Sequence, residues 1–332
     1  MSKNSALNAG GLVTSAENHK STVQDGTGSV PNAVSSALPA TAEHFMAAAQ
    51  GRATIVAYAS DVRHFLANGG TIPAKPQQVT AYLAQFAATL AVATLERRLI
   101  AIHKSHELLS AKSPTRHETV KRTMQGIRRT VGTKQQQALP MVKDDLLAAL
   151  VMIDRQKPVK AARDRALLLI GFAGAFRRSE LVAIRCEHIT QLANGVEIFL
   201  SESKTDQEKA GRTVFIPHAN GSHCPVSALA LWLELAGINE GYVFRAVTRS
   251  ERISKTGLSA QSVSLVVKAS VERYGGHGEK VSGHSLRAGY RTQAAMAGLQ
   301  PWQIREQTGH KSDATLAKYI RPVARRKLPS LL

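Results

Sequence analysis

The sequence predicts a mainly α-helical protein with a small antiparallel β-sheet, in which an all-helical domain precedes a mostly helical domain that holds the sheet. Three observations predict this fold class. Apolar residues recur at three- and four-residue spacing between Ile55 and Leu66, as on one face of a helix. A polar stretch without apolar anchors, residues 132–137, divides the chain. Farther along, residues 195–201 and 212–217 alternate in polarity as strands do.

The N-terminal part of the chain changes character after about 40 residues. Residues 1–40 are rich in Ser, Ala, Asn, Gly and Thr, and no aromatic residue occurs before Phe45. Such a segment cannot fix a core, so we expect a flexible arm followed by a helical domain at 41–131. Its first long helix should end at Gly69 and Gly70. Three more helices are expected at about 76–89, 91–110 and 113–131.

A linker is expected at residues 132–140 and a second domain at 141–332. The predicted elements of this domain are helices at about 142–155 and 161–174, strands at 195–201 and 212–217, and a short strand near 242–244. A polar loop, residues 202–211, joins the two main strands. The remainder is expected to be helical to the C-terminus.

The charge of the chain indicates a polyanionic partner. The 332 residues include 43 Lys and Arg against 24 Asp and Glu, which gives a formal net charge of +19. Hydrophobic residues make up 43% of the chain, so the excess belongs to a globular protein and not to a disordered basic tail. Nucleic acid is favoured over a membrane surface, because we find no lipidation signal or basic amphipathic anchor next to a terminus.

The cysteine and histidine pattern argues against disulfides, metals and other cofactors. The two cysteines, Cys186 and Cys224, do not form a Cys-x-x-Cys pair, and no ligand set has zinc spacing. The longest apolar runs, such as residues 166–175, are too short to cross a bilayer. We therefore expect a reduced, soluble protein in the cytoplasm, associated with the nucleoid.

An arginine pair follows the predicted helix at 161–174. If helix resumes there, Arg177 shares the inward apolar face with Leu181 and Ile184, whereas Arg178 faces away. A buried arginine is costly unless it meets an anion, either a carboxylate of the protein or a phosphate of a ligand. Glu180 is the candidate carboxylate, in a role of structural support.

A second group of polar residues lies near the end of the chain. His284 and Arg287 are three residues apart, so on a helix both can face one pocket. His310 and Tyr319 would point to opposite faces of one unbroken helix. A helix that begins anew at Ser312 would let them converge.

In this order the residues resemble the catalytic set of the tyrosine site-specific recombinases, also called the phage-integrase family. The matching motifs are Arg177-x-x-Glu180-Leu181, Lys204, His284-x-x-Arg287, Gly309-His310 and Tyr319. The resemblance covers about residues 41–332 and implies an all-helical, SAM-like core-binding domain followed by an α+β catalytic domain. Its N-terminal half rests mainly on one helix with Tyr58, Asp61 and Phe65.

The resemblance implies an enzyme that cleaves and rejoins DNA strands through a 3′-phosphotyrosine, without metal or ATP. Tyr319 would be the nucleophile and His284 the base that accepts its proton. Lys204 would protonate the departing 5′ oxygen, although Lys209 and Arg212 share its loop.

The remaining catalytic positions would hold the phosphate. Arg177 and Arg287 would each donate to nonbridging oxygens through a planar guanidinium, and His310 would add a further donor. Beyond this set, the candidate DNA-binding residues are Lys121, Arg122, Arg128, Arg129, Arg178 and Arg291.

The expected partners are double-stranded DNA recombination sites and other copies of this chain. Members of the family work as four protomers on two DNA sites, so a homotetramer is implied on DNA and a monomer or weak oligomer when free. Two alternatives stay open at this point. A type IB topoisomerase would use the same chemistry on unpaired DNA, and a non-catalytic sequence-specific binder would keep the fold alone.

Overall fold

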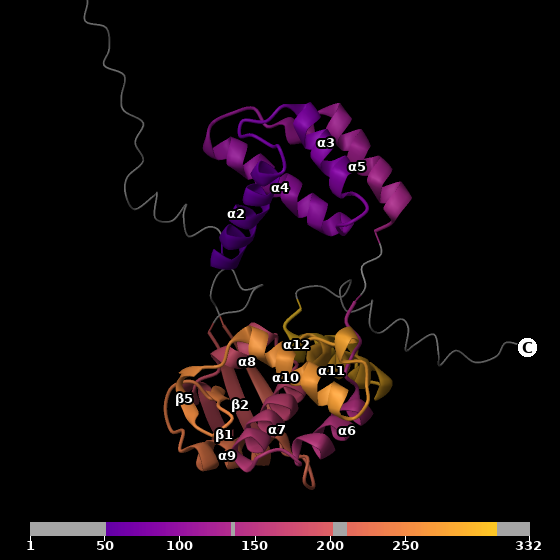
Figure 1. The fold of residues 1–332 in the computed structure, drawn as a ribbon. Coiled ribbons are helices and arrows are strands. Elements are labelled where there is room, and N and C mark those ends of the chain that lie inside the picture. The colour runs from indigo at the N-terminus through magenta and orange to yellow at the C-terminus, as the bar shows by residue number, and fades with distance from the viewer. Residues whose placement is uncertain (1–50, 134–136, 202–210, 311–332) are drawn as a thin grey trace, which may run out of the picture. The chain divides into compact units, whose positions relative to one another are not determined.

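The computed structural model describes residues 51–133, 137–201 and 211–310 (Figure 1). The chain divides into two compact units with the boundary between Lys134 and Gln135, here called the N-terminal and C-terminal units. Each unit has its own buried hydrophobic cluster. The expected arm at 1–40 and the expected helix from Ser312 lie outside the described residues.

The N-terminal unit is helical throughout its described part. Its elements are α2 (Arg52–Ala67), α3 (Pro76–Phe86), α4 (Val92–Leu108), the 3-10 helix η1 (Pro114–Arg116) and α5 (Glu118–Val131). α2 packs against α4 and α3 against α5, and their apolar faces meet around Phe65, Leu83 and Leu95. The predicted helix at 113–131 is wrong in one respect, because extended backbone at His117 separates η1 from α5.

Buried polar side chains also join α2 to its neighbours. Asp61 is 3% exposed and accepts hydrogen bonds from Arg97 Nε at 2.7 Å and Nη2 at 2.9 Å. Arg98 donates to the hydroxyl of Tyr82 at 2.6 Å. Because a buried carboxylate needs such partners, these bonds fix how α4 lies on α2 and α3.

The C-terminal unit surrounds a small sheet with helices. Its helices are α6 (Lys143–Ile153), α7 (Pro158–Ala173), α8 (Arg178–Ala183), α9 (Pro225–Ala236), α10 (Ala260–Arg273), α11 (Ser285–Met296) and α12 (Pro301–Thr308). Two short 3-10 helices, η2 (Cys186–His188) and η3 (Gly278–Lys280), join them. The mainly α-helical class with small antiparallel sheets is confirmed.

The strands form two antiparallel sheets. The first has the order β1 (Ile189–Leu192), β2 (Gly195–Leu200), β3 (Arg212–Pro217), and Val196 pairs with Ile216 and Ile198 with Val214 on its buried face. The second pairs β4 (Arg245–Val247) with β5 (Ile253–Gly257). The strands at 195–201 and 212–217 are confirmed, whereas β1 was not predicted.

Two expectations for the region after residue 240 are wrong. The strand expected near 242–244 begins instead at Arg245, and Tyr242 forms only an isolated bridge with Arg185. The segment is not helical to the C-terminus either, because β5 intervenes. Ser254, Lys255 and Thr256 in β5 give no apolar alternation, since this small sheet buries little surface.

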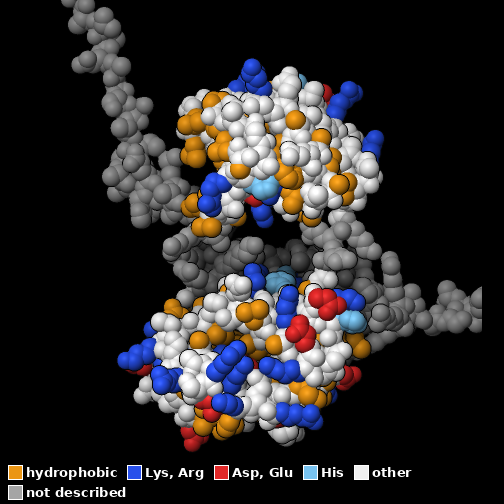
Figure 2. Space-filling view, in the orientation of Figure 1, with side chains coloured by type: hydrophobic (Ala, Val, Ile, Leu, Met, Phe, Trp, Pro, Cys, Tyr) orange, Lys and Arg blue, Asp and Glu red, His pale blue; other side chains and the backbone are white. Residues whose placement is uncertain are grey.

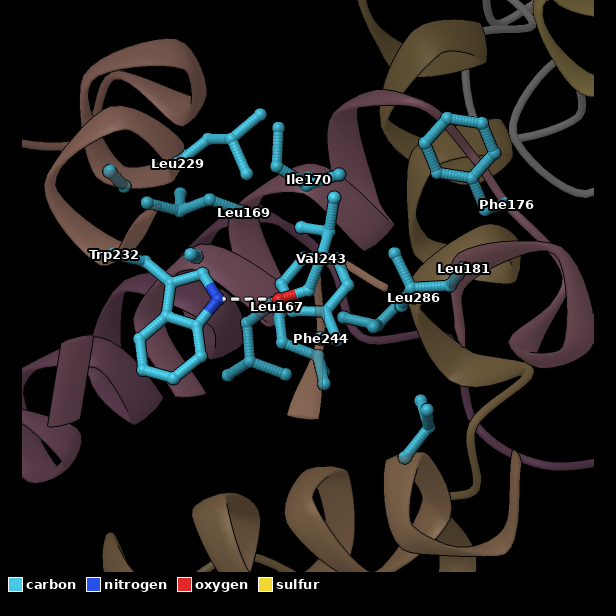
Figure 3. Packing of buried hydrophobic residues seen from close by; sticks show 14 of the residues in the cluster. Leu167, Leu169, Ile170, Phe176, Leu181, Leu229, Trp232, Val243, Phe244 and Leu286 are labelled. Atoms are coloured by element: carbon cyan, nitrogen blue, oxygen red, sulfur yellow. Dashed lines mark hydrogen bonds between the residues drawn. The ribbon is translucent and has the colours of Figure 1, made fainter. Parts of the chain in front are cut away.

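The core of the C-terminal unit brings α8 and α11 together on α7 (Figure 3). α7 is buried on nearly every side, and Trp232 closes one end by donating its indole N–H to Val243 O at 2.9 Å. At Gly171 in α7, a Cβ would lie 2.9 Å from Leu286 and 3.0 Å from Leu181. Glycine therefore permits the close approach that places α8 and α11 side by side.

No helix in the described ranges is long and apolar enough to span a membrane. Across the face shown in Figure 2, Lys and Arg side chains are spread over both units.

Candidate active site

Arg177 lies at the turn between α7 and α8. After α7 the chain passes through Ala175, which has a φ of 48°, and the buried Phe176, and helix resumes only at Arg178. Arg177 is therefore the N-cap of α8. The sequence pattern instead predicts that this residue lies within the helix. Its side chain is nonetheless 12% exposed, whereas Arg178 is exposed, which agrees with the predicted directions of the two side chains.

Glu180 is the carboxylate at the base of this turn. It is 3% exposed and accepts from the Arg177 backbone N–H at 2.8 Å and from Arg177 Nη1 at 2.5 Å. Arg212 Nη2 from β3 lies 3.5 Å from the same carboxylate. Burial by itself would raise the pKa of Glu180, but the Arg177 hydrogen bonds and the charges of Arg177 and Arg212 outweigh it and hold that pKa below its usual value.

This pairing predicts a pH-dependent contribution of Glu180 to stability. Because folding lowers its pKa, the contribution is fully present above the unfolded-state pKa, about 4.3, and is lost as the pH falls through the folded-state pKa. Glu180→Ala breaks a buried ion pair and should lower the free energy of unfolding by about 3–5 kcal/mol at neutral pH. Denaturant titrations from pH 7 to 3 measure this, and equal acid sensitivity of the wild type and Glu180→Gln would contradict it.

α11 supplies two more buried arginines. His284 is the N-cap of this helix, Arg287 is 1% exposed and Arg291, one turn later, is 2% exposed. Arg287 Nη1 donates to Ala175 O at 2.7 Å, so the turn that carries Arg177 also holds Arg287. The predicted helical placement of His284 and Arg287 is confirmed, with His284 at the helix boundary.

His310 completes the cluster from the end of α12. Its Nε2 lies 3.4 Å from Arg287 Nη2 and 3.2 Å from Arg291 Nη1, and its Nδ1 lies 2.6 Å from Thr308 Oγ1. Gly309, with a φ of 64°, turns the chain back so that the imidazole faces α11.

The cationic surroundings keep both histidines neutral. Loss of water contact and the charges of Arg287, Arg291 and Arg177 lower the pKa of His284. The same causes lower the pKa of His310 to about 3. Burial and the neighbouring cations also lower the pKa of Arg287 to about 9, which leaves it charged at neutral pH.

Arg212 also belongs to this cluster, although the sequence pattern indicates it only as a residue that shares the loop of Lys204. Its Nη1 donates to Gln307 O at 3.0 Å, and Gln307 Nε2 donates to Ala173 O at 2.9 Å. A Cβ on Gly309 would lie 2.7 Å from Arg212 Nε. Arg212 thus fastens the start of β3 to the end of α12, a contact between distant segments that the sequence does not indicate.

The cluster can hold a phosphate group through hydrogen bonds from more than one arginine. Among the described residues of this partly buried site, the guanidinium groups of Arg177 and Arg212 lie against Glu180. The guanidinium groups of Arg287 and Arg291 lie against His310. Planar guanidinium donors match phosphate oxygens in geometry and charge. Among the residues that the structure describes, no group of three or more His, Cys, Asp or Glu could hold a metal ion.

The other candidate residues are dispersed. On α5, Val120, Met124 and Ile127 are buried and Lys121, Arg122, Arg128 and Arg129 are exposed. Two of these cations have partners within the chain, since Arg122 lies 3.4 Å from Glu118 and Arg128 lies 2.8 Å from Glu96. Lys204 and Tyr319 lie outside the described residues.

The chain is similar in sequence to known proteins. A sequence model described as phage integrase family matches residues 140–326. The chain is 37% identical over 276 residues to the integrase/recombinase xerD homolog of Selenomonas ruminantium, an alignment that covers 80% of this chain and 81% of that protein.

Two solved structures have a similar fold. XerH site-specific recombinase bound to palindromic difH substrate, in a post-cleavage complex, aligns with a TM-score of 0.58 at 20% identity over 76% of this chain and 70% of that chain. A lambda integrase dimer bound to a COC' core site aligns with a TM-score of 0.60 at 15% identity over 88% of this chain and 78% of that chain. At these identities the likeness concerns the fold.

Proposed function

The chain belongs to the phage integrase family, and from this premise we propose that it is a site-specific recombinase acting through a 3′-phosphotyrosine. The observation that carries the proposal is the convergence of buried Arg287 and Arg291 with His310, beside Arg177. A cluster of this charge suits a phosphodiester whose negative charge grows during attack.

The described residues divide the work of phosphate activation. Arg177 and Arg287 donate to the nonbridging oxygens, and because they are fixed by Glu180 and Ala175 O they need little reorganisation when the phosphate arrives. His284 is uncharged at neutral pH and can accept the proton of the attacking phenol. His310 would contact the phosphate through Nε2, the ring nitrogen that lies 3.2 Å from Arg291 Nη1.

Tyr319 is the nucleophile in this proposal, and the other tyrosines support that choice by their surroundings. Of six tyrosines in the sequence, Tyr58 and Tyr82 belong to the N-terminal unit. Tyr242 packs its ring against the Arg185 guanidinium, and Tyr274 donates to Asp145 at 3.4 Å. Tyr290 is on α11, but it packs against Phe172, and burial raises its pKa, which opposes ionisation.

The proton donor for the leaving 5′ oxygen is proposed to be Lys204. Arg212, which shares its hairpin, is a weaker candidate, because Arg212 is held by Glu180 and by Gln307 O and its guanidinium retains its proton. Lys209 remains the alternative to Lys204.

We also propose the domain roles. Residues 41–131 would form a core-binding domain, 132–140 a linker and 141–332 the catalytic domain. Two domains on one linker can grip a duplex, with the exposed cations of α5 and with Arg178 on its backbone. The protein would act on double-stranded DNA sites of the nucleoid as a homotetramer.

Binding to DNA is expected to weaken steeply with salt. A protein that makes about six to ten phosphate contacts loses about 10³- to 10⁵-fold in affinity between 50 and 200 mM salt, because bound counterions are released on association. Fluorescence anisotropy with a duplex selected from a random pool measures this, and a salt-independent affinity would contradict a phosphate-based grip.

A recombination assay with the selected duplex tests the function. Plasmids with two copies of the site are incubated with the protein in EDTA without ATP, and deletion or inversion of the intervening segment is expected. Relaxation of supercoiled plasmids without sites, and without exchange, would indicate a type IB topoisomerase. Binding without any strand breakage would indicate a non-catalytic binder.

A further inference from the structure

The hydrogen bonds of His310 determine which of its ring nitrogens carries the proton. Nε2 faces Arg287 Nη2 at 3.4 Å and Arg291 Nη1 at 3.2 Å. A guanidinium has N–H donors and no acceptor, so Nε2 must present its lone pair to them. The neutral ring therefore carries its proton on Nδ1, and Nδ1–H donates to Thr308 Oγ1 at 2.6 Å.

Thr308 can only accept from this ring. It is 0% exposed, and its own hydroxyl hydrogen is directed at Ile304 O, 2.6 Å away in the preceding turn of α12. Turning the hydroxyl toward Nδ1 would break that bond in a site that offers little water in exchange. The two bonds thus form a chain with a fixed direction, in which His310 Nδ1–H donates to Thr308 Oγ1 and the Thr308 hydroxyl donates to Ile304 O.

We propose that Thr308 is a positioning residue that fixes the orientation and tautomer of His310, so that Nε2 is the nitrogen presented to the scissile phosphate. The inference rests on the proposed function. A lone pair would repel a phosphate oxygen, so when DNA binds the N–H groups of Arg287 and Arg291 that face Nε2 turn to the phosphate oxygens, and Nε2 takes up one proton from solvent. The resulting imidazolium donates from both nitrogens, with Nε2–H directed at the phosphate. The phosphate supplies the countercharge that this step needs.

In the described part of the chain, the charged groups that lower the pKa of His310 are all arginines, which oppose that proton. Arg287 and Arg291 come from α11, Arg177 from the start of α8 and Arg212 from β3. The ring is therefore neutral until an anion enters, and its charge is coupled to the presence of the phosphate. Thr308 makes this coupling specific to Nε2, because Nδ1 is already committed.

Imidazole ¹⁵N NMR of the full-length protein without DNA tests the tautomer directly. The His310 signals are assigned by their absence in His310→Gln, and the Nδ1–H tautomer is expected in the wild type and in Thr308→Ser. Thr308→Val, which keeps the branched shape and lacks the hydroxyl, should have a smaller share of the Nδ1–H tautomer than the wild type, because only the guanidinium donors at Nε2 then favour it. A wild-type protein with the proton on Nε2 would overturn the proposal, whether or not the protein is a recombinase.

The kinetic test separates positioning from folding. At saturating site DNA, covalent complex formation by Thr308→Val should be about 10- to 100-fold slower, the range seen when a group that orients a functional histidine is removed. Its DNA affinity should stay within about twofold, because the hydroxyl is turned away from solvent. Thr308→Ser should recover most of the rate, and Thr190→Val on the exposed strand β1 is the matched control.

Two outcomes would count against a positioning role. Wild-type rates in a folded Thr308→Val protein would show that the hydroxyl is dispensable. A Thr308→Ser protein as slow as Thr308→Val would show that shape alone matters. If Thr308→Val does not fold, the wild-type and Thr308→Ser spectra still decide the tautomer.

Discussion

Replacing Tyr319 by phenylalanine should abolish covalent attachment to DNA while leaving DNA binding intact. The substitution removes one oxygen and keeps the ring, so the loss falls on the nucleophile and not on packing. A phenol with a pKa near 10 is about three units from ionisation at pH 7, about 4 kcal/mol, so the reaction depends on nearby cations as well as on a base. Arg177, Arg287 and Arg291, which lower the pKa of His284 and of His310, are the cations that we expect to assist Tyr319.

The assay uses a duplex with a nick beside the cleavage position, so that a short fragment diffuses away and the covalent complex accumulates. Tyr290→Phe is the matched control, because Tyr290 lies on α11 between Arg287 and Arg291. We expect wild-type adduct from Tyr290→Phe and none from Tyr319→Phe. Covalent adduct formed by Tyr319→Phe, or loss of the adduct in Tyr290→Phe, would show that Tyr319 is not the nucleophile.

Replacing Arg287 by alanine should slow covalent complex formation about 10²- to 10³-fold. This corresponds to a loss of about 2.7–4 kcal/mol of transition-state stabilisation. Arg287 is 1% exposed and held by Ala175 O, so its donors are fixed before the phosphate enters. Arg287→Lys should recover little, because an ammonium keeps the charge but cannot reproduce the planar fork of donors. Stopped reactions resolved on denaturing gels give the rates.

DNA affinity provides the contrast for Arg287. Loss of one phosphate contact among several should reduce the slope of log affinity against log salt concentration by about one. We expect the loss in DNA affinity to be far smaller than the loss in rate. Arg178→Ala is a suitable comparison, since Arg178 is exposed beside the same turn. A rate loss in Arg178→Ala that equals the loss in Arg287→Ala would mean that general electrostatics, and not the buried site, drives the reaction.

The sequence predicted the helices and the main hairpin because these elements bury regular apolar faces. Val196, Ile198, Val214 and Ile216 alternate as the register requires. β1 and β5 could not be predicted in the same way, because β1 is mostly exposed and β5 belongs to a two-stranded sheet with little buried surface. Where burial does not impose a period, periodicity carries no signal.

The candidate site was predictable in residue type but not in geometry. The order of arginines and histidines identified Arg177, His284, Arg287 and His310, which the structure places in one region. The parts that orient them, Arg212 through Gln307 O and Thr308 through His310 Nδ1, depend on contacts between distant segments or across a turn. No spacing rule in the sequence marks such partners, because many surface arginines and threonines look the same.

The central claim is that a DNA strand becomes esterified through its 3′-phosphate to Tyr319. The most direct measurement is mass spectrometry of the peptide that remains attached to DNA after nuclease and protease digestion of a trapped complex, combined with end-labelled DNA to identify the attached strand end. We expect a single modified peptide containing Tyr319, a 3′ linkage and a free 5′-hydroxyl on the departing strand. Attachment at another residue, or through a 5′-phosphate, would contradict it.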